Sequence, residues 1–144
     1  MNETQNPRLG LRRFGAVIAG LLAVIVLSIG TDAVMHAVGV FPPIGQPMTD
    51  AHLSLLLATF YRSVYGVAGS YLAARLAPDR PMQHAMAVGI VGLALSIAGV
   101  VATWNAGPEF APRWYPLALV ATALPCAWAG GKLRAMQVRA RAGG

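Results

Sequence analysis

The residues with the most chemical potential in this sequence are polar side chains inside apolar runs. Arg62 lies within ATFYRSVYGVAGSYLAARLAP, whose other residues largely favour lipid. An arginine inside a membrane costs roughly 2.5 to above 10 kcal/mol, so it normally has a partner and faces a bundle interior or a cavity. Asp32 is the only acidic residue inside an apolar run. We therefore predict an Asp32–Arg62 ion pair.

Further polar groups are expected near this pair. Ser28 and His36 lie one helical turn before and after Asp32, which places all three on one helix face. Tyr61 and Tyr65 flank Arg62 and can donate hydroxyl hydrogen bonds. The candidate polar cluster therefore consists of Asp32, Arg62, His36, Tyr61 and Tyr65.

Three interpretations of this cluster stay open at the level of sequence. A buried ion pair can fix which helices are neighbours, although such pairs stabilise a fold poorly. In the second interpretation the cluster attracts anions or handles protons at membrane depth, with Asp32 and His36 titrating and Arg62 binding an anionic group. In the third, Arg62 faces an acidic residue of a partner protein.

The motifs of the common enzyme and metal-site classes are absent from the sequence. It contains no HExxH, no GxSxG and no phosphate-cradling glycine loop. Its single cysteine, Cys126, cannot run dithiol chemistry or form an intramolecular disulfide. No two of the five carboxylates are placed as an acid–base pair. We therefore expect no catalytic residues, no metal site and no cofactor.

Composition indicates a membrane as the surroundings of this chain. Of its 144 residues, 56% are hydrophobic and 11% are charged, whereas a soluble domain has about 25% charged residues. The mean hydropathy is +0.58. The net charge of +6 suits nucleic acid, but the basic residues are dispersed at the ends of apolar runs and form no single face, which argues against that class of partner. The expected partner is the lipid bilayer.

Four apolar runs are each long enough to cross about 30 Å of hydrocarbon, which takes roughly 20 residues. The predicted spans are 14–38, 51–76, 82–104 and 114–131, with basic tails 1–13 and 132–144. A cleaved signal peptide is the rival interpretation of the first run, but the uncharged stretch is longer than the 7–15 residues of such signals. The sequence thus predicts one domain, an all-α antiparallel bundle of four transmembrane helices.

Basic residues set the orientation of the predicted bundle. Nine lysines and arginines fall on the side that holds both chain ends, and Arg113 alone falls on the other. Trp104, Trp114 and Tyr115 then gather at the outer interface, which amphipathic rings favour. We therefore predict that both termini lie in the cytoplasm, and we expect His84 to be solvated at the cytoplasmic end.

Small residues are expected to bring the helices together, because lipid provides no hydrophobic drive for helix association. On the third predicted span they recur at spacings of three and four, which places them on one narrow face. The face consists of Ala85, Gly89, Gly92, Ser96, Gly99 and Thr103. One interpretation is packing within the bundle, and the other is a surface for a partner protein or a second copy.

Two stretches together resemble a known group of proteins. They are YRSVYGVAGSYLAARLAPDRPMQHAMAVGIVGLALSIAGVVATW and the later WYPLALVATALPCAWAGGKLR. They resemble small four-span bacterial proteins described only as hypothetical membrane proteins. The resemblance covers Tyr61 to Arg134 and implies a location in the bacterial inner membrane, with no assigned activity.

Two functions follow from these patterns. The first is a non-enzymatic accessory or assembly protein whose small-residue faces bind a membrane-protein partner or a second copy. The alternative is a small transporter or channel, formed by a dimer, that uses Asp32 and Arg62. A third role is the binding of anionic lipid by the basic tail. The orientation rule already requires positive charge there, so the charge does not by itself indicate lipid binding. A water-accessible cavity reaching Arg62 would favour the alternative, and a dry, fully paired arginine would favour the first.

Overall fold

The chain forms four α-helices and no strand within residues 7–144, which are the residues that the computed structural model describes. The helices are α1 (Pro7–Ala37), α2 (His52–Leu76), α3 (Pro81–Thr103) and α4 (Trp114–Ala142). The predicted all-α class is therefore confirmed for this part of the chain. Residues 1–6 of the predicted basic tail lie outside the described residues.

The helices extend beyond the predicted spans where the sequence is basic. Within the described residues α1 runs from Pro7, seven residues before the predicted span. Pro81 opens α3, because proline suits the first turn, where its missing N–H is not needed. It directly follows Arg80, which has a left-handed backbone with φ 42°. α4 continues to Ala142, so the basic segment after residue 131 is also helical.

Two of the helices are long and apolar enough to cross a membrane. Over their most apolar windows α1 has a mean hydropathy of 2.4 and α3 a mean hydropathy of 2.3. α2 and α4 are of similar length, with 25 and 29 residues, but they carry more polar side chains, among them Arg62 in α2. By length and composition the described chain thus contains two candidate membrane-spanning helices.

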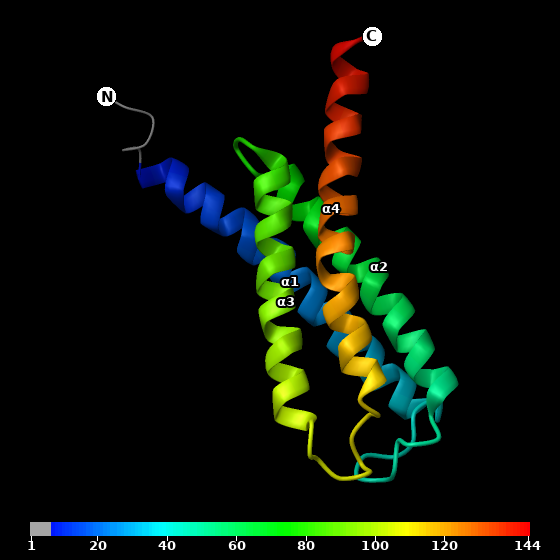
Figure 1. Ribbon diagram of the computed structural model, residues 1–144. Helices are drawn as coiled ribbons and strands as arrows, with labels where there is room; N and C mark the ends of the chain where they lie inside the picture. Colours follow the sequence, from blue (N-terminus) through cyan, green and yellow to red (C-terminus); the bar gives the residue numbers. More distant parts are fainter. Residues whose placement is uncertain (1–6) are drawn as a thin grey trace.

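α2 is the element that contacts all the others. It packs against α1, α3 and α4, while α3 packs along α4. α1 meets α3 over a short region and does not pack on α4 within residues 7–144. In Figure 1 the α2–α3 turn and the end of α4 lie at one end of the bundle, and the two long loops lie at the other. α4 projects beyond α2 and α3 at the first end (Figure 1).

The helices cross at glycines, where their backbones touch. A Cβ atom added to Gly20 of α1 would lie 2.5 Å from the carbonyl oxygen of Gly69 in α2, and one added to Gly69 would lie 2.6 Å from that of Gly20. A Cβ on Gly130 of α4 would come within 2.5 Å of the α2 backbone. Gly89 of α3 lies directly against the methyl group of Ala127 in α4. A larger side chain at any of these positions would force two helices apart.

The small-residue face of α3 is packed along only half of its length. Ala85 is fully buried, and Gly89 contacts α4. Gly92 and Gly99 have no other atom within 4 Å of an added Cβ. The face therefore seats α4 near the α2–α3 turn and is open toward the loop end of the bundle.

Small side chains fill the interior, and large apolar side chains cover the outside. Most of the buried hydrophobic residues are alanines, namely Ala16, Ala58, Ala73, Ala74, Ala85 and Ala127. On the outside, Val26 and Ile29 of α1 are 65% and 64% exposed, and Phe60 of α2 is 68% exposed. Soluble proteins place large aliphatic side chains inside, whereas bundles in lipid place small residues at helix contacts. The exterior of this bundle therefore suits hydrocarbon.

An ion pair joins α1 to the α2–α3 turn. Arg13 donates from Nε to Asp79 Oδ1 at 3.0 Å and from Nη2 to Asp79 Oδ2. This hydrogen bonding lowers the pKa of the Asp79 carboxyl. The pair fixes the start of α1 against the next turn of the chain.

His84 lies beside this ion pair and is buried, with 8% of its surface exposed. Its Nδ1 donates to the carbonyl oxygen of Arg80 at 3.1 Å. The expectation of a solvated His84 is therefore wrong, because the ring folds back onto the first turn of α3 and bonds to its backbone.

Gly69→Ala tests the contact between α1 and α2. The added methyl group would overlap Gly20, so the helices must separate, and we expect the free energy of unfolding to fall by about 1–3 kcal/mol. Gly92→Ala is the matched control, because an added Cβ there meets no atom, and it should be at least as stable as the wild type. Unfolding by sodium dodecyl sulfate in mixed micelles measures both variants, and equal stability of the two would contradict the prediction.

Asp79→Asn tests the ion pair at the α2–α3 turn. Because the pKa of Asp79 is lowered in the fold, the pair stabilises the fold above the unfolded pKa of about 3.9. That stabilisation is lost as the pH falls through the lower folded pKa. We expect the variant to melt below the wild type at neutral pH and the difference to shrink below about pH 4. Asp50→Asn, in an exposed loop, is the control, and thermal unfolding over a pH series is the measurement.

Candidate functional site

The structure brings Asp32, Tyr61 and Arg62 into one hydrogen-bonded network. Arg62 donates from Nη2 to Asp32 Oδ2, and the Tyr61 hydroxyl donates to Asp32 Oδ1. α1 and α2 are consecutive antiparallel helices, which places Asp32 opposite Arg62 although 29 residues separate them. The side chains of Arg62 and Asp32 are 32% and 26% exposed. The ion pair is therefore partly buried, and both carboxylate oxygens accept a hydrogen bond.

The other two members of the predicted cluster make separate contacts. The hydroxyl of Tyr65 shares a 2.8 Å hydrogen bond with that of Thr31. His36 Nδ1 donates to the carbonyl oxygen of Pro42 at 2.9 Å, and its ring meets the Phe41 ring at 5.2 Å between centroids. These residues join α1 to α2 and to the following loop, and neither is hydrogen-bonded to the ion pair.

Phe41 in the loop after α1 covers the network at the loop end of the bundle. It is 5% exposed and packs with Ala58 and Tyr61 of α2. Tyr115 of α4 packs against the same cluster. This apolar cover holds Tyr61 in place and thereby directs its hydroxyl toward Asp32.

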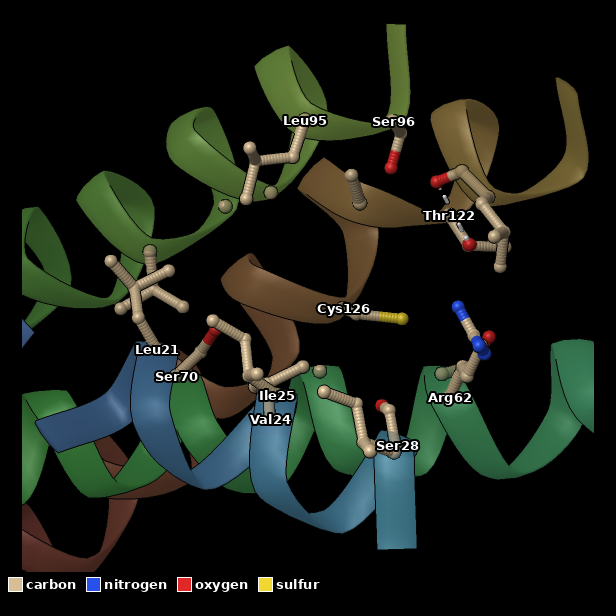
Figure 2. Close-up of a pocket in the computed structure, with 18 residues that line it drawn as sticks. Leu21, Val24, Ile25, Ser28, Arg62, Ser70, Leu95, Ser96, Thr122 and Cys126 are labelled. Atoms are coloured by element: carbon tan, nitrogen blue, oxygen red, sulfur yellow. Dashed lines mark hydrogen bonds between the residues drawn. The ribbon is translucent and has the colours of Figure 1, made fainter. Parts of the chain in front are cut away.

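A cavity of about 290 Å³ lies beside Arg62 and is lined by all four helices. Figure 2 shows Arg62, Thr122 and Cys126 around the same space. The hydroxyls of Ser63 and Thr122 line it but donate back to carbonyl oxygens one turn earlier, at 2.7 and 3.0 Å. Most of the remaining wall is aliphatic and comes from Leu21, Val24, Ile25, Ile29, Val88, Leu95 and Leu119.

A second cavity, of about 390 Å³, lies toward the long loops. It shares four wall residues with the first cavity, namely Arg62, Leu95, Ser96 and Leu119. Its other end reaches Phe110 and Tyr115. Arg62 therefore stands where the two cavities adjoin, and the open half of the α3 small-residue face forms part of both walls.

The guanidinium of Arg62 is incompletely paired. Its Nε is buried and has no hydrogen-bond partner within residues 7–144. A buried donor without an acceptor costs about 1–3 kcal/mol. A guanidinium has five N–H groups, so donation to Asp32 leaves it able to bind a further acceptor. The site combines the donors of a guanidinium that is ion-paired with Asp32 and an apolar cavity.

Metal ligation has no support in the described part of the chain. Residues 7–144 contain no group of three or more histidine, cysteine or acidic side chains that could hold an ion. Cys126, at the cavity wall, has no second thiol to pair with.

Sequence reasoning missed the contributions of α3 and α4 to the site. Ser96 was assigned to a packing face, and Thr122 and Cys126 were not singled out. The spacing of Leu119, Thr122 and Cys126 at three and four residues is a signal that could have placed them on one helix face. It does not indicate which helix that face meets.

A double-mutant cycle tests the ion pair. Asp32→Asn leaves the guanidinium without its counter-charge, and Arg62→Leu leaves the carboxylate without its own. Each variant should lose about 1–3 kcal/mol of unfolding free energy, less than the 3–5 kcal/mol of a fully buried pair because both side chains are partly exposed. The double variant should recover most of the loss. Unfolding in mixed micelles of the four proteins gives the coupling energy.

Tyr65→Phe supplies the control for this cycle. It removes a hydroxyl that bonds Thr31 and not Asp32, so its effect should add to that of Asp32→Asn. Losses at Asp32 and Arg62 that simply add would show that the two residues do not depend on each other.

Comparisons of the chain with protein-family models, with curated proteins and with solved structures find no match. The resemblance to small four-span bacterial proteins therefore stays an expectation from the sequence, and the function has to be argued from the geometry of the site.

Proposed function

We propose that this protein crosses the bilayer four times, has both ends in the cytoplasm, and binds a guest within the bilayer without catalysing a reaction. The observation that carries the proposal is the cavity lined by all four helices, which reaches an arginine with an unpaired donor. The guest would lie in this cavity. From the sequence, a cavity reaching Arg62 favours the transporter alternative, and a dry, fully paired arginine favours an accessory protein. We therefore place binding at the Asp32–Arg62 site of that alternative.

The lengths and surfaces of α2 and α4 support four spans. At 1.5 Å per residue they measure about 37 and 43 Å, more than the ~30 Å of the hydrocarbon core. Phe60 and Val64 of α2, and Leu117 of α4, are 68%, 46% and 45% exposed. Because α2 packs on both α1 and α3, it lies at the same depth as those apolar helices.

The distribution of charged and aromatic side chains supports the orientation. Basic residues gather at the end that holds the α2–α3 turn, on Arg8, Arg12, Arg13, Arg75, Arg80, Lys132, Arg134, Arg139 and Arg141. At the loop end Arg113 stacks 4.7 Å from the ring centroid of Trp104, and Trp114 Nε1 donates to His52 Nδ1 at 3.3 Å. Basic cytoplasmic loops and interfacial aromatic rings are typical of inner-membrane proteins, which agrees with the bacterial location that the resemblance implies.

The packing favours holding a guest over conducting one. Toward the basic end the bundle closes at the crossing of Gly20 and Gly69, where the two backbones touch. At the other end the cavities open, and Gly92 and Gly99 leave space on α3. The assembly role predicted from the small-residue faces would use this same opening, with the helix of a membrane-protein partner as the guest.

The sole cysteine provides a test, because Cys126 lines the cavity. In lipid vesicles we expect the membrane-permeant reagent monobromobimane to label Cys126 in the folded protein. Ser96→Phe should slow the labelling severalfold by filling the space between α3 and α4. Ile97→Phe is the matched control, because residue 97 is 47% exposed on another face of α3. Labelling only after unfolding in detergent would contradict an open cavity.

Two further cysteine positions test the orientation with the same chemistry. In a Cys126→Ser background, a membrane-impermeant maleimide should label Asn105→Cys in intact cells and Ala142→Cys only after permeabilisation. Both positions are exposed. The reverse pattern would invert the proposed topology.

A further inference from the structure

We propose that the guest is a lipid-derived anion, a carboxylate or phosphate head group on a single aliphatic chain, with Arg62 as the anchor for the head group. This inference rests on the proposed function, because it names the guest of the same cavity.

The hydrogen bonds around Asp32 leave part of the Arg62 guanidinium without an acceptor. Asp32 accepts from Arg62 through one oxygen and from Tyr61 through the other, so the ion pair is not a bidentate fork. Nε of Arg62 has no partner within residues 7–144. A carboxylate or phosphate can accept two parallel N–H bonds from a guanidinium, which makes arginine a specific anchor for these head groups. The hydrogen bond from Tyr61 offsets part of the negative charge of Asp32.

A second polar group faces the same space from the opposite helix pair. Figure 2 shows the Ser96 hydroxyl of α3 directed into the cavity, across from Arg62 of α2. A hydroxyl can donate to an anionic oxygen. A head group between these residues would therefore be held from both α2 and α3.

The walls and the opening of the cavity suit an aliphatic chain. Beyond Arg62, seven leucine, valine and isoleucine side chains line the walls, together with smaller residues that include four serines. α1 and α3 contact each other little, and their side chains at the rim, Ile25, Ile29 and Leu95, are 42%, 64% and 59% exposed. In a bilayer this rim faces hydrocarbon, so an acyl chain can enter sideways without leaving an apolar medium.

The size and depth of the site further restrict which molecules can be the guest. A volume of about 290 Å³ lies at the lower end of the range for ligand pockets, which favours one chain over two. Arg62 lies 13 residues before Arg75, so it stands about 20 Å from the basic end and about 10 Å below the opposite surface. The second cavity leads from Arg62 to Phe110 and Tyr115 at that surface, which gives a charged head group a route to the guanidinium.

Protection of Cys126 against monobromobimane tests the inference on the full chain in phosphatidylcholine vesicles. Dodecanoate and dodecyl phosphate should protect the thiol at about tenfold lower mole fraction than dodecanol or dodecyltrimethylammonium, because charge-assisted hydrogen bonds favour the anions. Ala142→Cys in a Cys126→Ser background corrects for changes in surface charge, since it lies outside the cavity.

Arg62→Lys is the decisive variant, because it keeps the positive charge and removes the Nε donor and the planar fork. In this variant the two anions should protect Cys126 little better than dodecanol does. Protection by dodecanol itself shows that the cavity is intact. Arg13→Gln changes an arginine of α1 that pairs with Asp79 at the α2–α3 turn, outside the cavity, and should leave the preference for anions unchanged.

Each other outcome overturns the inference in a recognisable way. Equal protection by all four amphiphiles would show that the cavity has no preference for an anion, and it would not contradict the proposed function. Protection by inorganic phosphate as strong as that by dodecyl phosphate would point to a free anion. No protection, together with a dimer that Ser96→Phe disrupts, would identify the guest as a helix of a second copy. A thiol that never reacts in the folded protein would refute the proposed function itself.

Discussion

Direct contact between helix backbones is the constraint on which the rest of this structure depends. In lipid the helices gain nothing by hiding apolar side chains from water, so they associate where backbones can approach closely. α1 and α2 touch backbone to backbone at Gly20 and Gly69, and α1 crosses the bundle obliquely (Figure 1). Within residues 7–144 α1 meets α3 over a short region and does not pack on α4. The cavity occupies the space that this leaves between the four helices.

The Asp32–Arg62 ion pair joins α1 to α2 on the loop side of the Gly20–Gly69 contact. The long arginine side chain reaches from α2 to Asp32 on α1. Tyr61 donates to the same carboxylate and packs with Phe41. A partly buried ion pair adds little net stability but discriminates strongly against arrangements that leave either charge alone. The same arginine can thus specify the neighbour of α1 and still present donors to the cavity. The structural and functional interpretations of Arg62 are compatible.

The sequence predicted the helical class and the ion pair for different reasons. Four apolar runs predict helices, because few other backbone structures can cross lipid. Asp32 is the one acidic residue at nearly the same depth as Arg62, so it is the expected partner of the arginine. The cavity could not be predicted, because periodicity defines a helix face and not its distance from the next helix. Gly89 and Gly92 look equivalent in sequence, yet only Gly89 meets α4. By contrast, the basic segment after residue 131 is rich in helix-forming alanine, arginine, leucine and lysine, which allows α4 to continue but does not fix where it ends.

Because of this continuation α4 has two parts of different character, one that lines the cavity and a basic one that projects beyond the bundle. Thr122 and Cys126 form part of the cavity wall, and Arg139 lies on the same helix about 20 Å further along. Pro125 removes one backbone hydrogen bond beside the wall, which is where a helix bends most easily. If α4 tilts when the width of the cavity changes, its basic end lies further from the bend than the cavity wall does. That end and its positive charge therefore move sideways by the larger distance. The cavity wall and the exposed basic end are thus parts of one continuous helix, α4.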